Sequence, residues 1–236
     1  MGPKASQELG VGFEIEKDVD RTFLDGTKFT EKHRLSLTIV LRTIALLQQD
    51  VGYVQGLNFI LGNLLMQLEH LEPSKAQLIA IATFLMYLNE LGFKHLYTEK
   101  MLGLKEAIFK LEVLLYNLMP EVYIFLVQNQ IFLDYFASQW FLTLFQYDIE
   151  DVEQSNLIML MALMFGSKFI FQVAFQLINH IRSKLQCLSF EQALCYLKDF
   201  ASEPHFRSSK FLLESLENTL ITNELLKELS AVHKRM

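Results

Sequence analysis

The chain of 236 residues has little glycine, proline and cysteine. Its 10 glycines and 4 prolines argue against a fold of many short strands joined by tight turns, so long helices are the natural alternative. Two cysteines, Cys187 and Cys195, cannot build a disulfide framework or a four-ligand zinc site, which favours a reducing, cytoplasmic setting. We expect both thiols to be buried among apolar side chains.

The chain also lacks an excess of positive charge. Its 21 Lys and Arg residues against 27 Asp and Glu residues give a formal net charge of -6 at pH 7. Neutralisation of phosphates by Lys and Arg supplies most of the affinity of proteins for nucleic acids. The charge therefore predicts no nucleic-acid partner.

Short motifs with fixed catalytic or metal-binding spacing are missing as well. The sequence contains no HxxxH, CxxC, GxSxG, GxGxxG or GxxxxGK[ST]. His180 with the two cysteines would need a fourth ligand to hold zinc, and the spacing offers none. We predict no metal site.

Apolar residues, in contrast, are abundant, at 51% of the chain with 20 Phe and 9 Met. The stretch 157–178 is long enough to span a bilayer if it is helical, but Lys168 at its centre would cost about 2.5 to 3.5 kcal/mol there. We predict no transmembrane segment and expect two buried helices or one kinked helix, with a membrane span as the alternative. Trp140 and the Met-rich segment 158–164 are also expected in the core.

Apolar residues recur at intervals of three and four along most of the chain, which is the pattern of amphipathic helices. Thr30 is a plausible N-cap, while Ser74 with Gln77 and Ser189 with Gln192 have the spacing of capping boxes. The sequence predicts an all-α fold of about ten helices in two lobes, residues 1–130 and 131–236. The expected helical segments are 14–21, 31–49, 54–70, 74–89, 104–118, a short helix that begins at Pro120, 134–146, 156–182, a helix that begins at the capping box of Ser189, and 208–229, which forms one or two helices.

Two polar motifs stand apart from this apolar background. Ile15, Asp18 and Arg21 have the form IxxDxxR, with a spacing that places all three along one side of a helix. About thirty residues after Arg21, a turn at Gly52 is followed by the predicted start of a helix. The second motif there, of the form YxQGxN, consists of Tyr53, Gln55, Gly56 and Asn58.

These motifs and the segment WFLTLF at 140–145 resemble the TBC (Tre-2/Bub2/Cdc16) domain, the GTPase-activating domain for Rab-type small GTPases. The resemblance extends from Ile15 to at least Arg182. It implies a two-lobed helical domain whose partner is a Rab-family GTPase in the GTP-bound state. It also implies that the domain has no cofactor of its own, because GTP and Mg²⁺ arrive with the GTPase. A cytoplasmic domain recruited to endomembranes through its Rab partner is expected.

The motifs contain the side chains that this activity needs. Small GTPases hydrolyse GTP slowly because charge develops on the phosphoryl oxygens and the attacking water is poorly held. Arg21 is expected to stabilise that charge in trans, with its guanidinium oriented by Asp18 one turn earlier. The amide of Gln55 can accept from water and donate to phosphate, so the resemblance implies that it replaces the GTPase's own glutamine. The expected supporting residues are Ile15, Tyr53, Gly56 and Asn58.

The chain departs from the family's pattern in three places. Leu24 stands where a proline is usual, and Met159 and Leu160 precede Gly166 where an acidic WD-type motif is common. The helix with an RxxxW-type motif that commonly precedes IxxDxxR is missing. None of these departures removes Arg21. The alternative function is a non-catalytic module that binds a Rab or assembles a complex without accelerating hydrolysis.

Overall fold

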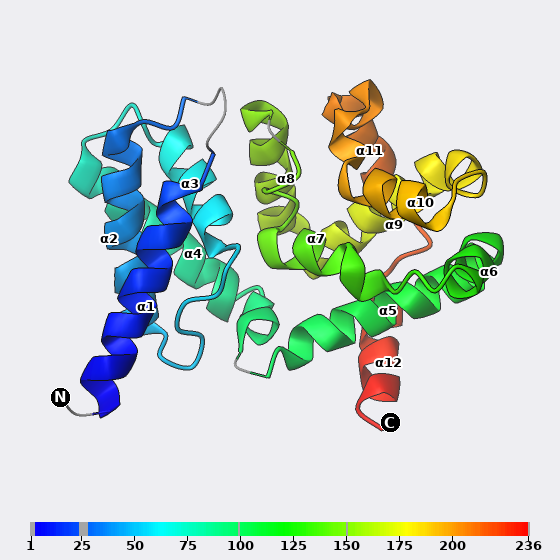
Figure 1. The fold of residues 1–236 in the computed structure, drawn as a ribbon, viewed down its shortest axis with the longest axis horizontal. Coiled ribbons are helices and arrows are strands. Elements are labelled where there is room, and N and C mark those ends of the chain that lie inside the picture. The colour runs from blue at the N-terminus through cyan, green and yellow to red at the C-terminus, as the bar shows by residue number, and fades with distance from the viewer. Residues whose placement is uncertain (1–2, 24–27, 99, 150, 236) are drawn as a thin grey trace. The chain divides into compact units, whose positions relative to one another are not determined.

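The computed structural model describes residues 3–23, 28–98, 100–149 and 151–235. Within them the chain forms twelve α-helices and four short 3₁₀ helices and no strand (Figure 1). The all-α fold is therefore confirmed, with two α-helices more than the ten or so expected. The segment 208–229, expected to form one or two helices, forms two, because the chain turns between residues 217 and 222.

The chain divides into two compact units, Met1–Lys100 and Met101–Met236. This boundary lies upstream of the one expected near residue 130. The difference arises because the helix Leu102–Leu118 (α5) packs against the helix Pro120–Gln128 (α6) and against helices that follow it, so both belong to the second unit.

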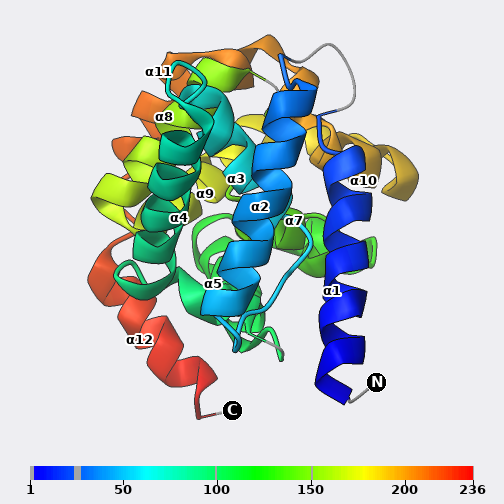
Figure 2. The ribbon, with the colours of Figure 1, turned by 90° about the vertical axis from the view of Figure 1, so that its left-hand side faces the viewer.

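The first unit is organised around its second helix. It contains α1 (Pro3–Asp20), α2 (Glu31–Leu47), α3 (Leu57–Gln67), α4 (Pro73–Asn89) and a 3₁₀ helix, Phe93–Tyr97. Helix α2 contacts α1, α3 and α4, and Figure 2 shows α1 and α4 on its two sides. The predicted apolar stripe of α2 consists of Leu37, Val40, Leu41, Ile44 and Leu47, and all of these are buried except Leu47, which is exposed at the end of the helix.

Two expected helix caps in this unit have different outcomes. Thr30 is the N-cap of α2, where its backbone N–H donates to Nδ1 of His33 at 3.0 Å. The capping box predicted at Ser74 is wrong, because α4 begins at Pro73, whose fixed φ suits the first helical position. Gln77 instead donates to the hydroxyl of Ser36 at 3.1 Å and so ties α4 to α2.

The second unit is organised around α9 (Ser167–Leu185). Helix α9 contacts α5, α7 (Ala137–Thr143), α8 (Val152–Phe165) and α11 (Ser209–Leu216). Gly166, at φ +70°, separates α9 from α8, so the stretch forms two helices, the first of the two expected alternatives. The capping box of Ser189 with Gln192 is confirmed. The helices after α6 are α7 (Ala137–Thr143), α8 (Val152–Phe165), α9 (Ser167–Leu185), α10 (Phe190–Lys198), α11 (Ser209–Leu216) and α12 (Asn223–His233), with 3₁₀ helices Leu133–Tyr135, Phe200–Ser202 and Pro204–Arg207.

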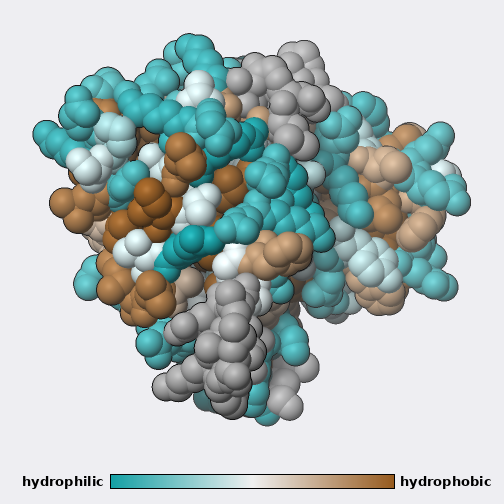
Figure 3. Space-filling model, turned by 60° about the vertical axis from the view of Figure 1, so that its left-hand side comes forward, coloured by the Kyte–Doolittle hydropathy of each residue, from teal (hydrophilic) through white to brown (hydrophobic). Residues whose placement is uncertain are grey.

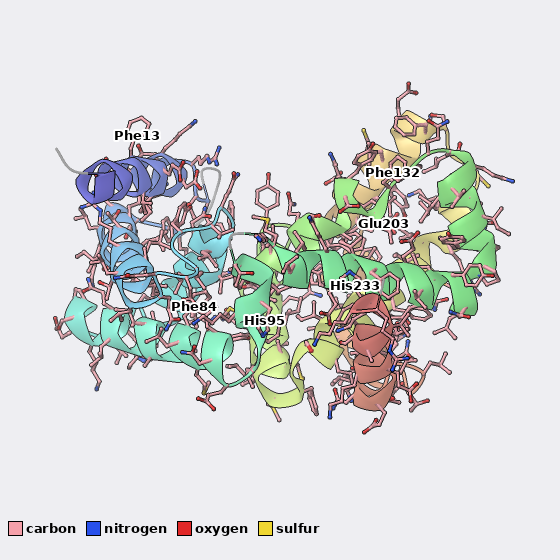
Figure 4. All side chains as sticks on the ribbon, turned by 90° about the horizontal axis from the view of Figure 1, so that it is seen from below. Phe13, Phe84, His95, Phe132, Glu203 and His233 are labelled. Carbon is pink, nitrogen blue, oxygen red and sulfur yellow. The ribbon has the colours of Figure 1, made fainter. Side chains whose placement is uncertain are left out.

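The last helix of this unit docks on α5. The hydroxyl of Ser230 donates to Oε1 of Glu106 at 2.6 Å. The ring of His233 lies 5.1 Å from that of Phe109, at the junction of α12 and α5 in Figure 4. These contacts join residues far apart in the sequence within one unit.

Trp140 lies in the core of the second unit, as predicted. It is fully buried, and its ring is in contact with the rings of Phe136, Phe145 and Phe200, at centroid distances of 4.9, 5.6 and 5.7 Å. The Met-rich segment 158–164 is buried on one side only. Ile158 and Met159 are buried, whereas Leu160 and Met164 are exposed.

The abundant apolar side chains of the protein are therefore only partly buried in its core. Apolar side chains reach the surface of the first unit, where hydrophobic and hydrophilic residues alternate over α2 and α4 (Figure 3). The exposed apolar residues of these helices are Leu35, Ile39, Leu46, Leu47, Leu78 and Met86. No single described helix is both long and apolar enough to cross a membrane, although α5 and α6 together, bent by 118°, reach that length and composition.

The expectation of buried thiols is wrong, because Cys187 and Cys195 are both exposed. Cys187 follows the end of α9. Cys195 lies on α10, which is short and amphipathic and buries Ala193 and Leu197 on its other side. The number of cysteines in a sequence gives no information about which face of a helix they occupy.

Candidate functional site

Arg21 is the first residue after α1 and lies in a turn. Its Nη2 lies 2.5 Å from Oδ1 of Asp18, which confirms the predicted pair one helical turn apart. The Asp18 side chain is 7% exposed, whereas that of Arg21 is 44% exposed. Since a guanidinium has five N–H donors, this ion pair leaves donors for an incoming anion.

Gln55 lies in the turn that leads into α3, and it is exposed. The next residue, Gly56, has φ +110°, a conformation that side chains other than glycine rarely adopt. The backbone N–H of Gly56 donates to Oδ1 of Asn58 at 3.0 Å. Gly56 and Asn58 therefore shape the turn in which Gln55 lies.

Hydrogen bonds join the two motifs directly within the first unit. The hydroxyl of Tyr53 donates to Oδ2 of Asp18 at 2.5 Å, so one carboxylate serves both Arg21 and Tyr53. Nδ2 of Asn58 donates to the hydroxyl of Thr22 at 2.8 Å, and that hydroxyl donates to the carbonyl of Asp18 at 2.6 Å. The residues after Arg21 and those around Gln55 thus form one connected polar network.

The hydroxyl of Tyr53 stays protonated in this network. Burial, together with the hydrogen bond to Asp18, raises the pKa of Tyr53 well above its ordinary value, so its hydroxyl remains a donor at neutral pH. Ile15 is fully buried and fixes the inner face of α1 one turn before Asp18. Through its hydrogen bond, Tyr53 orients the carboxylate that pairs with Arg21.

A cluster of aromatic rings around Phe23, which no pattern in the sequence indicated, lies beside the network. Phe23 has a left-handed backbone conformation, with φ +50°, which is uncommon for a bulky side chain. Its ring packs edge-on against those of Phe29 and Phe59, with centroid distances of 5.4 and 5.5 Å. Gly62 on α3 lies against this ring, and a Cβ at that position would be 2.9 Å from Cε2 of Phe23.

We expect the substitution Gly62→Ala to destabilise the chain by about 1 to 3 kcal/mol, because Phe23 is held between two rings and cannot move away without strain. Gly10→Ala is the matched control, since Gly10 is also helical and a Cβ there meets nothing within 4 Å. It should stabilise the chain by up to about 1 kcal/mol. Urea unfolding of both variants measures the difference, and equal free energies of unfolding would contradict this account.

The positions that depart from the family's pattern have different surroundings. Leu24 lies outside the described residues. On α8, Met159 is buried and Leu160 is half exposed. Among the residues that the structure describes, no three His, Cys, Asp or Glu side chains gather in a way that could hold a metal ion.

Comparison with known proteins identifies the family. The model of the Rab-GTPase-TBC domain family matches residues 4–186, so the chain belongs to this family. It is 33% identical over 187 residues to TBC1 domain family member 4 of Mus musculus and 31% identical over 187 residues to the Ecotropic viral integration site 5 ortholog of Drosophila melanogaster. These alignments cover 77% and 78% of the chain but 14% and 22% of the relatives, so the chain matches only a small part of their length.

Two solved structures share the fold. The Chlamydomonas flagellar RabGAP TBC domain has a TM-score of 0.71 at 21% identity and matches 91% of this chain and 69% of its own. The Ypt/Rab-GAP domain of Gyp1p has a TM-score of 0.70 at 15% identity and matches 97% of this chain and 74% of its own. At these identities the likeness establishes the two-lobed helical fold.

Proposed function

We propose that the chain is a GTPase-activating protein for a GTP-bound Rab-type GTPase, with Arg21 and Gln55 acting in trans. The single observation that carries this proposal is the shared carboxylate of Asp18. It pairs with Arg21 and accepts from Tyr53 of the second motif, so one group links the two segments that carry the proposed catalytic residues. The family of the chain gives independent support.

The proposed chemistry is hydrolysis of the partner's GTP. The oxygen of a water attacks the γ-phosphorus, the bond between that phosphorus and the bridging oxygen to the β-phosphate breaks, and GDP and phosphate result. The guanidinium of Arg21 donates to the oxygens on which negative charge grows. The amide of Gln55 accepts from the attacking water and donates to a phosphoryl oxygen. GTP and Mg²⁺ are supplied by the GTPase.

The ion pair with Asp18 favours this role. A free arginine side chain has many rotamers, and ordering it costs free energy when the GTPase binds. Asp18 restricts the guanidinium beforehand, and Tyr53 restricts Asp18. Such a domain would act in the cytoplasm, on the endomembranes where its Rab partner is loaded with GTP.

The test is release of phosphate from a panel of GTP-loaded Rab proteins, with and without the chain. We expect acceleration of at least one Rab, and we expect Gln55→Ala to reduce that acceleration about 10²-fold, as loss of one positioned group does in other active sites. Gln49→Ala is the matched control, because Gln49 is also an exposed glutamine in a turn of the first unit. It should leave the rate unchanged. Tight binding of a GTP-bound Rab without acceleration would contradict catalysis and favour a capturing module.

A further inference from the structure

Arg34, which belongs to neither motif, reaches the end of α1 from α2. Its Nη1 donates to the backbone carbonyl of Val19 at 2.5 Å and lies 3.3 Å from the carbonyl of Asp20. The last carbonyls of a helix have no partner within the helix and carry its partial negative charge. A guanidinium at this place therefore caps α1 at the residue that precedes Arg21.

The contact lies one peptide unit from Arg21. The carbonyl of Asp20 and the backbone N–H of Arg21 belong to the same planar peptide group, so a bond to this carbonyl restricts the direction in which Arg21 leaves the helix. The carbonyl of Val19 also accepts from the backbone N–H of Thr22 at 3.1 Å, and thus Arg34 joins the hydrogen bond that closes the turn.

The side chain of Arg34 is itself held in place by an aromatic ring. Its guanidinium carbon lies 5.3 Å from the centre of the Phe29 ring, a cation–π distance. Phe29 is buried and stacks on His33, with ring centroids 5.4 Å apart. The guanidinium is therefore oriented by a packed aromatic face before it meets the end of α1.

We propose that Arg34 is a positioning residue for Arg21: by capping α1 it fixes the peptide from which the Arg21 side chain projects toward the phosphate. This inference rests on the proposed function of Arg21. The ion pair with Asp18 restricts the guanidinium end of Arg21, and Arg34 restricts its backbone end. Misplacement of about 1 Å at a reacting group can cost 10²-fold in rate.

The test compares Arg34→Met with Arg42→Met. Arg42 is the matched control, because it is also on α2 and also binds α1, through Glu16 at 2.5 Å, but one turn before the end of that helix and through a side chain instead of the last carbonyls. Single-turnover hydrolysis over a range of chain concentrations separates the maximal rate from the half-saturating concentration. Arg34→Met should lower the maximal rate roughly 10-fold to 100-fold and leave half-saturation within about twofold, because only the transition state is affected. Arg42→Met should change neither.

Hydrogen exchange of the Thr22 amide in the free chain gives a second readout that needs no partner. It should be faster in Arg34→Met and unchanged in Arg42→Met. The conservative variant Arg34→Lys, which keeps the charge and a donor, should lie between wild type and Arg34→Met in both measurements, and it carries the test if Arg34→Met does not fold. If the wild-type chain accelerates a Rab and Arg34→Met leaves the maximal rate unchanged, this inference is overturned and the proposed function stands. A wild type that accelerates no Rab overturns the proposed function, and this inference with it.

Discussion

Replacing Arg21 with alanine is expected to lower the stimulated rate of GTP hydrolysis by 10³-fold or more, because an arginine supplied in trans is typically worth about 10³ to 10⁵ in turnover. The side chain is exposed enough to reach a partner, and its pairing with Asp18 defines the direction from which it does so. Arg21→Lys should recover little, since an ammonium is a point charge without the planar fork of donors that matches phosphoryl oxygens. Single-turnover phosphate release measures both variants.

Arg42→Ala is the control for this experiment, because Arg42 is an arginine of the first unit with similar exposure and an ion pair of its own to Glu16. An exposed pair of this kind contributes about 1 kcal/mol or less to stability, so its loss should leave the stimulated rate within about twofold. Equal losses at Arg21 and Arg42 would indicate a general effect on the fold and would contradict a specific role for Arg21.

The substitution Asp148→Asn is expected to stabilise the chain strongly at pH 8 and less than half as much at pH 5. Oδ1 of Asp148 accepts from Nε2 of Gln139 at 2.8 Å, whereas Oδ2 is enclosed without a partner. Burial raises the pKa of this carboxyl to about 7. The folded chain therefore retains a proton that the unfolded chain has lost, and the enclosed charge becomes a cost as pH rises.

The size and pH range of this effect follow from linkage. Below about pH 4 the carboxyl is protonated in both states and costs nothing; stability is then lost as pH rises and levels off above about pH 7. Each whole step in pKa is worth about 1.4 kcal/mol, so the gain for Asp148→Asn at pH 8 is roughly 2 to 4 kcal/mol. Urea unfolding at pH 5 and pH 8 measures it, with Asp134→Asn as the exposed control. A gain that does not depend on pH would contradict this interpretation of Asp148.

The helices were predictable because their apolar spacing records which face is buried. The apolar stripes of α2 and α5 depend on residues three and four positions apart. The helix starts at Thr30 and Pro120 likewise depend on residues close in the sequence. The boundary between the units was not predictable in the same way, because it depends on which helices α5 packs against, far along the chain. Ser74 also shows that a local capping pattern yields to a proline one residue earlier.

In the candidate site too, contacts within one helical turn were predictable and contacts between distant segments were not. The pair of Asp18 and Arg21 was predictable, since both belong to one helical turn. The bond from Tyr53 to Asp18 spans 35 residues, and helical spacing gives no information on which side chain of another segment will reach a carboxylate. Phe23 against Gly62 and Arg34 against the end of α1 were missed for this reason.

The most direct test of the central claim is single-turnover hydrolysis by a Rab that the wild-type chain accelerates, measured with Arg21→Ala, Gln55→Ala and the double variant. Binding of the GTP-loaded Rab is measured in parallel, so that loss of catalysis is distinguished from loss of binding. We predict that the double variant still binds and that the hydrolysis rate falls to that of the Rab alone. Acceleration that survives the loss of both side chains would contradict it.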